Sequence, residues 1–203
     1  MDLLEPDWQQ PRPTSTEVDE MMGRILLSPI ALPAKPFTEF VSRLRDDRGN
    51  GGAHLAAFDV GQDRTLDWFV SRNRFSEVIS DVVTHPMIRK SLSEVRIPAS
   101  PPSPSTDDSG FQFFDPFLLQ GTFANLLYSG GAYTLARGDG RAENQIALEV
   151  CESMFGLRYG EICCSPNYDQ WTPWFRGIAW DVTIVVFDRR TRMMWILAVT
   201  DTD

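Results

Sequence analysis

The stretch that decides the fold closes the chain: "WTPWFRGIAWDVTIVVFDRRTRMMWILAVTDTD", residues 171–203. Two apolar runs, "IAWDVTIVVF" at 178–187 and "MMWILAVT" at 193–200, flank the charged sequence "DRRT" at 188–191. Runs rich in β-branched and aromatic residues that are joined by a short polar turn predict a β-hairpin. A strand covered on one face alternates apolar with polar residues, whereas both faces of these runs are apolar. We therefore expect the hairpin to lie in the middle of a sheet that helices cover on both sides.

The pairing within this hairpin also determines where its acidic residues lie. A turn centred on the two arginines of "DRRT" places Asp181 opposite Ala198 and Ile178 opposite Asp201, which brings Asp181, Asp201 and Asp203 toward one end of the sheet. Clusters of carboxylate oxygens bind magnesium or calcium, so a metal site is one reading of these acids. The pleat, however, puts Asp181 and Asp201 on opposite faces, and chain ends fray. A buried Asp181 that accepts hydrogen bonds is the competing prediction.

Helical periodicity and capping signals recur in the sequence upstream of the hairpin. The capping-box pair Thr14 and Glu17 predicts the start of a helix that Pro29 ends, and Pro36 predicts the start of a second helix before Gly49. A strand is predicted at 53–61, and helices are predicted from Arg64 to Val95 with a division at Pro86. Another helix is predicted from Asp115-Pro116, through the apolar positions Phe117 and Leu118, to Gly130-Gly131. A last helix is predicted at 141–155, and Gly156 ends it.

These elements predict the domain organisation. Residues 1–13 contain three prolines and no periodicity, so we expect an extended N-terminal arm. Residues 14–203 are predicted to form a single α+β domain, in which a central, mainly antiparallel sheet includes the C-terminal β-hairpin and packs against several helices. Residues 97–110, "IPASPPSPSTDDSG", are rich in Pro and Ser; they form a long surface loop or separate two lobes, and the sequence leaves both possibilities open.

Composition and charge exclude several classes of partner. The chain of 203 residues has 28 acidic and 19 basic residues, a net charge of −9, and no basic stripe, so direct nucleic-acid binding is not expected. No apolar run approaches the ~18 residues that span a bilayer, and the start "MDLLEPDWQQPRP" lacks the basic and apolar regions of a signal peptide, which predicts a cytoplasmic protein with no membrane partner. Three cysteines, two of them adjacent, fit reduced structural thiols. An acidic surface suits a basic partner.

Signatures of catalysis and cofactor binding are missing from the sequence. His54 and His85 have no second ligand at zinc spacing, and no serine or cysteine stands in a nucleophile motif. The glycine-rich stretch "YSGGAYTLARGDG", residues 128–140, lacks the patterns of phosphate-binding loops and is predicted to be a connector. We therefore expect no cofactor, no metal and no catalytic residue, although carboxylates elsewhere in the chain leave an enzyme possible.

Five aromatic residues stand within 13 positions, mostly in a predicted loop: Tyr168, Trp171, Trp174, Phe175 and Trp180. Aromatic side chains in ordered loops anchor protein interfaces, and they also cover the ends of sheets in ordinary cores. The sequence is compatible with both roles.

The segment "WFRGIAWDVTIVVFDRRTRMMWILAVTDTD", with the upstream "GGAY" and "FGLRYGE", resembles the tails of small bacterial proteins of the kind encoded beside polymorphic toxins as immunity partners, and the resemblance covers only the C-terminal third of this chain. The resemblance depends mainly on the WD-x-T and terminal TDTD patterns. It implies a single-domain, cytosolic, non-enzymatic protein that neutralises a cognate toxin by occluding it. The residues that we expect to contact such a basic toxin domain are Asp107, Asp108, Asp115, Asp169, Trp171, Trp174 and Phe175.

Two alternative functions are also compatible with the sequence. One is a small-molecule-binding protein or enzyme with a pocket near 168–181, for which a deep and partly polar pocket would argue. The other is a subunit of a phage or secretion assembly, for which a large exposed apolar patch or a stable oligomer would argue. The sequence leaves the oligomeric state open.

Overall fold

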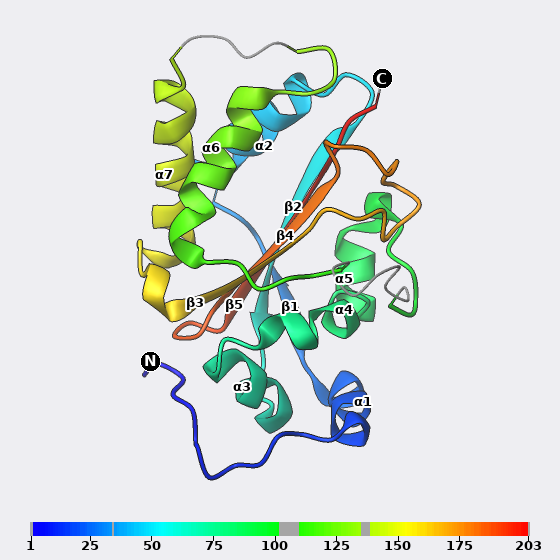
Figure 1. Ribbon diagram of the computed structural model, residues 1–203, viewed down its shortest axis with the longest axis vertical. Helices are drawn as coiled ribbons and strands as arrows, with labels where there is room; N and C mark the ends of the chain where they lie inside the picture. Colours follow the sequence, from blue (N-terminus) through cyan, green and yellow to red (C-terminus); the bar gives the residue numbers. More distant parts are fainter. Residues whose placement is uncertain (1, 34, 102–109, 135–138, 203) are drawn as a thin grey trace.

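A five-stranded antiparallel sheet forms the centre of the computed structural model, which describes residues 2–33, 35–101, 110–134 and 139–202 (Figure 1). The strands, in the order β1-β2-β5-β4-β3 across the sheet, are β1 (Leu27–Ile30), β2 (Gly52–Val60), β5 (Met193–Thr200), β4 (Val182–Asp188) and β3 (Ile162–Asn167). The hairpin of β4 and β5 is therefore internal, with β5 as the middle strand. Both the α+β class and the central C-terminal hairpin are confirmed.

Helices cover both faces of this sheet (Figure 1). On β4, Val182, Ile184 and Val186 join the apolar cluster of one face, while Val185 and Phe187 join the cluster of the other. Each buried aliphatic or aromatic side chain contributes about 1.5–3 kcal/mol to stability. A run that is apolar at every position is therefore stable only where both faces are covered, which explains the composition of the hairpin.

The helices fall into two layers. Against the face that carries Trp195 and Leu197 lie α2 (Phe37–Asp46), α6 (Leu119–Ser129) and α7 (Arg141–Phe155). Against the face that carries Met194 and Ile196 lie α1 (Ser15–Arg24), α3 (Arg64–Ser71), α4 (Ile79–Val82) and α5 (Pro86–Ser91). Short 3-10 helices lie at Phe75–Glu77, Ser93–Val95, Pro116–Leu118 and Tyr159–Glu161.

Several predicted helix boundaries are confirmed, because capping depends on local chemistry. The Thr14 hydroxyl accepts a hydrogen bond from the Glu17 amide, and the Glu17 carboxylate accepts one from the Thr14 amide, so α1 begins with a complete capping box. The helix α7 spans the predicted 141–155 and ends at Gly156 with φ 61°. Pro86 begins α5, where the Nδ1 atom of His85 accepts a hydrogen bond from the Met87 amide.

The first helix and the sheet edges differ from the predictions. The helix ends at Arg24, and Pro29 lies in β1 instead, paired with Phe58. Neither β1 nor β3 was predicted from the sequence. Both are edge strands that contain a proline, which a sheet tolerates only where the missing amide faces outward. These strands form by pairing with residues that are distant in the sequence, so no local sequence pattern predicts them.

The hairpin register is shifted by two residues from the predicted one. Ala198 pairs with Thr183 and not with Asp181. The turn includes Arg192, whose φ is 60° and whose amide donates a hydrogen bond to the Asp188 carbonyl at 2.9 Å. The Asp188 carboxylate also accepts hydrogen bonds from the Arg190 and Thr191 amides, at 2.8 and 3.2 Å. These bonds centre the turn one position later than its two arginines, which moves every pair along the hairpin.

The segments outside the helices and strands also contact the body. Residues 2–13 contain no helix or strand, and the Gln10 carbonyl accepts a hydrogen bond from the Trp68 indole at 3.1 Å. Of the Pro/Ser-rich stretch 97–110, residues 102–109 lie outside the described part of the chain. Within the described residues, no helix is both long and apolar enough to cross a membrane.

Candidate functional site

The loop between β3 and β4, residues 168–181, divides its aromatic side chains between core and surface. Trp171 and Phe175 are 5% and 0% exposed, and they belong to the cluster on the α3 and α5 face of the sheet. The Trp171 indole donates a hydrogen bond to the Thr183 hydroxyl on β4 at 2.8 Å. Because both rings close one end of the core, we correct the predicted contact set: these two residues offer no surface to a partner.

Trp174 occupies an intermediate position in the same loop. Its ring is partly buried and lies edge-on to the His54 ring, with centroids 5.2 Å apart. Burial lowers the pKa of His54, partly offset by the carboxylate of Glu94, which lies 3.4 Å from its Nε2 atom. A neutral imidazole at neutral pH packs against an indole without a desolvated charge. Trp174 therefore offers only part of its ring to solvent.

The predicted acidic contacts have different environments. Asp115 is exposed, and its carboxylate accepts a hydrogen bond from the Phe117 amide at 3.0 Å. Asp169 is half-buried, and its carboxylate accepts a hydrogen bond from the Gly110 amide, which fixes the end of the neighbouring segment. Asp107 and Asp108 lie outside the described residues.

Beside these acids, the segment before α6 exposes large apolar side chains. Phe113, Phe117 and Leu118 are 62%, 69% and 57% exposed. We call these three residues and Asp115 the edge surface, because their segment runs along β3 at the edge of the sheet. The Phe117 ring stacks on the Tyr159 ring, with centroids 5.5 Å apart. Phe117 and Leu118 were predicted to be apolar positions of one helix from Asp115-Pro116 to Gly130-Gly131, whereas they lie in a 3-10 helix and α6, whose first residue Leu119 is buried, begins after them.

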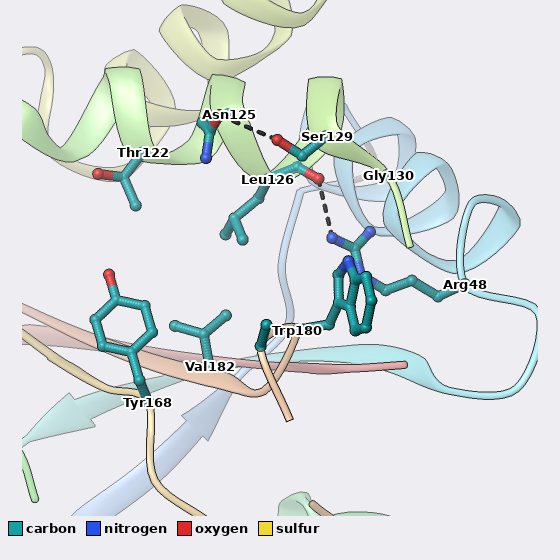
Figure 2. Close-up of a pocket in the computed structure, with 10 residues that line it drawn as sticks. Arg48, Thr122, Asn125, Leu126, Ser129, Gly130, Tyr168, Trp180 and Val182 are labelled. Carbon is teal, nitrogen blue, oxygen red and sulfur yellow. Dashed lines mark hydrogen bonds between the residues drawn. The ribbon is translucent and has the colours of Figure 1, made fainter. Parts of the chain in front are cut away.

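A cavity of about 230 Å³ opens between α6 and the start of β4 (Figure 2). It lies near the loop in which a pocket was predicted as an alternative. From α6 and the residue after it, Thr122, Asn125, Leu126, Ser129 and Gly130 line the cavity. The opposite wall consists of Tyr168, Ala179 and Trp180 of the loop, Val182 at the start of β4, and the buried Arg48. No carboxylate lines it, so among the described residues it offers no acid for general acid–base catalysis.

Asp181, the first of the acids considered for a metal site, is fully engaged in hydrogen bonds. It is 1% exposed, and its Oδ2 atom accepts three backbone amides, from Arg176, Gly177 and Ile178, at 2.8, 2.6 and 3.1 Å. Its Oδ1 atom accepts the Thr200 hydroxyl. The carboxylate thus organises the turn that precedes β4, which is why the strand begins at Val182 and not at Ile178.

Asp201, the second of these acids, joins three segments of the chain. It is 0% exposed; its Oδ1 atom accepts the Asn50 amide at 3.2 Å, and its Oδ2 atom accepts the Ala132 amide at 2.7 Å. Asp203 lies outside the described residues. Within the described part of the chain, no group of three His, Cys, Asp or Glu residues could hold a metal ion.

The thiols are buried and free. Cys163 faces one apolar cluster and its neighbour Cys164 faces the other, so the two point to opposite sides of the sheet. Burial raises the pKa of Cys151 and of Cys163 to about 12 and also raises the pKa of Cys164. At neutral pH these side chains are protonated, which suits packing and not nucleophilic attack.

Comparisons of the chain with protein-family models, with curated proteins and with solved structures found no match. The edge surface, the cavity and the net charge of the chain are therefore the features that bear on its function.

Proposed function

We propose that the chain is a non-enzymatic, acidic binding protein of the immunity type, which neutralises a basic bacterial toxin domain in the cytoplasm by covering its active site. The observation that best supports this proposal is the edge surface, where Phe113, Phe117 and Leu118 are each more than half exposed beside Asp115. Clustered exposed apolar side chains favour a protein interface, whereas single ones do not.

The edge surface is held in place before any partner arrives. The Gln112 amide donates to the Pro166 carbonyl and the Phe114 amide to the Cys164 carbonyl, both at 3.1 Å, so the segment pairs with the outer side of β3. At its far end, Asp115 caps the 3-10 helix Pro116–Leu118. A preorganised surface loses less conformational entropy on binding, which raises affinity for a given buried area.

Apolar and acidic groups have separate roles in this proposal. Burying an exposed phenylalanine or leucine contributes about 1.5–3 kcal/mol per side chain, and such residues at the centre of an interface set the residence time. The net charge of −9 attracts a basic partner, so it raises the rate of association more than it raises affinity. Asp115, which is exposed within the edge surface, supplies a local acceptor for an arginine or lysine of the toxin.

Co-expression in cells tests the proposal. Wild-type protein is expected to protect cells from a toxin encoded next to its gene, and the Phe117→Ser variant is expected to lose protection because the affinity falls at least about tenfold. The matched control is Leu26→Ser, which removes a side chain of similar size that is 72% exposed elsewhere on the molecule. The control variant should protect like the wild type.

Two results would count against the proposal. The first is that the wild-type protein protects cells from none of the toxins encoded beside its gene. The second is that Phe117→Ser and Leu26→Ser protect equally well. If the purified protein instead forms a stable oligomer that buries Phe117, the result supports an assembly subunit, because the exposed apolar surface then meets a second copy of the chain.

A further inference from the structure

One of the residues that line the cavity beneath α6 carries a buried positive charge. Arg48 is 3% exposed; its Nη1 atom donates to the Leu44 carbonyl at 3.0 Å and its Nη2 atom donates to the Leu126 carbonyl at 2.9 Å. Among the described residues its Nε atom has no hydrogen-bond partner, and no carboxylate lies within ion-pair distance of its guanidinium. A buried cation without a paired anion is costly, so such a group favours an acceptor that arrives from outside the chain.

The nearest acids do not supply this acceptor. Asp47 and Asp201 act on Arg48 only at longer range, where they partly offset the burial that lowers the pKa of its guanidinium. Both carboxylate oxygens of Asp201 already accept backbone amides. An arginine guanidinium remains protonated at neutral pH even when burial lowers its pKa, so the cavity wall at Arg48 is positive.

The remaining walls suit a flat, partly apolar group. Tyr168 and Trp180 stand on the sheet side of the cavity, and Leu126 and Val182 contribute apolar surface between them (Figure 2). Opposite, the Asn125 carboxamide accepts the Ser129 hydroxyl at 3.1 Å through its oxygen, and Figure 2 shows its nitrogen pointing into the cavity. Aromatic rings favour a planar ligand, and amide and hydroxyl donors favour one that carries acceptor oxygens.

We propose that this cavity binds a small aromatic carboxylate, with the carboxylate toward Arg48 and the ring between Tyr168 and Trp180. Its volume of about 230 Å³ lies below the range that is typical of sites for drug-sized molecules, so the ligand is a single-ring acid. The charge on the ligand compensates the buried guanidinium, and the Asn125 amide donates a second hydrogen bond. The site is separate from the edge surface and does not depend on the immunity function.

Titration calorimetry with two probes tests this site in the full-length protein. Benzoate carries the carboxylate, and benzamide has the same shape without the charge. The wild-type protein is expected to bind benzoate at least about tenfold more tightly than benzamide, since a charge-assisted hydrogen bond is stronger than a neutral one.

Two variants and a matched control locate the site. Asn125→Asp is expected to weaken benzoate binding at least about tenfold because it places a negative charge at the cavity wall. Gln62→Glu adds the same charge at an exposed position that does not line the cavity, and it should bind benzoate like the wild type. Arg48→Lys keeps the positive charge but loses the planar guanidinium, so benzoate should bind more weakly but still more tightly than benzamide. Circular dichroism confirms that each variant is folded.

Several results would overturn the proposal. Equal affinity for benzoate and benzamide would mean that Arg48 does not recognise the carboxylate. Equal losses in Asn125→Asp and Gln62→Glu would mean that benzoate responds to overall charge and not to the cavity. Absence of detectable binding by the folded wild-type protein at millimolar benzoate would remove the site altogether.

Discussion

Substitutions at Asp181 measure how much a single buried carboxylate contributes to the end of the sheet. In Asp181→Ala, three backbone amides, those of Arg176, Gly177 and Ile178, lose their acceptor, and so does the buried Thr200 hydroxyl. Hydrogen bonds to a charged group contribute about 1.5–3 kcal/mol each. Because Arg176 and Gly177 are exposed and Ile178 is half-buried, water replaces some of this energy, and we take about 1 kcal/mol for each amide. With about 1 kcal/mol more for the buried Thr200 hydroxyl, the expected loss in the free energy of unfolding is about 4 kcal/mol.

The isosteric variant Asp181→Asn separates hydrogen bonding from volume. An asparagine oxygen still accepts the three amides, and its nitrogen donates to the Thr200 hydroxyl, so only the charge is lost and the expected cost is about 1 kcal/mol. Urea unfolding followed by circular dichroism measures both values. If Asp181→Ala stays within about 0.5 kcal/mol of the wild type, or if the two variants cost the same, the carboxylate does not hold this turn as argued.

Three further predictions follow from other buried groups. Burial lowers the pKa of His85 below 6.5, so the imidazole binds a proton less readily in the folded protein than in the unfolded chain, and stability falls as the pH drops through 6.5. Between about pH 8 and pH 5 the wild type should therefore lose more unfolding free energy than the variant His85→Asn. The asparagine keeps an oxygen that caps the helix but does not titrate. The native thiols, with the pKa of Cys163 raised to about 12, should react with a disulfide reagent only as fast as the protein unfolds, and a rapid reaction of the folded state would contradict their burial. Gly131→Ala should cost about 1–3 kcal/mol because its Cβ would lie 2.0 Å from the Asp201 carboxylate, whereas Gly121→Ala, with nothing within 4 Å, should be neutral or stabilising in a thermal melt.

The parts of the fold that local chemistry determines could be predicted from the sequence. Each of three signals depends on residues a few positions apart, so each can be recognised in the sequence. They are the capping box at Thr14, the end of a helix at Gly156 and the two apolar runs of the hairpin. The hairpin register could not be predicted, because Arg192 adopts a left-handed backbone conformation that an arginine in the sequence does not indicate. The edge strands β1 and β3 become strands only by pairing with β2 and β4.

The candidate site was less predictable than the fold. Aromatic density identified the 168–181 loop but could not separate Trp171, which hydrogen-bonds within the core, from Trp180, which lines the cavity. The exposure of Phe117 was missed because it precedes α6 in the same apolar run, whereas the buried face of the helix begins only at Leu119. No local sequence pattern identified Arg48, because it lines the cavity through the packing of α6 against it, and its hydrogen bond to the Leu126 carbonyl joins residues 78 positions apart.

Hydrogen exchange with and without the proposed toxin partner tests whether the chain binds through its edge surface. We expect slow exchange in β5 in both states, because it is the middle strand of a covered sheet. On addition of the toxin domain, exchange should slow in peptides that cover residues 112–118. If the toxin slows exchange elsewhere and leaves residues 112–118 unchanged, the chain binds its partner through another surface and the edge surface is not its binding site.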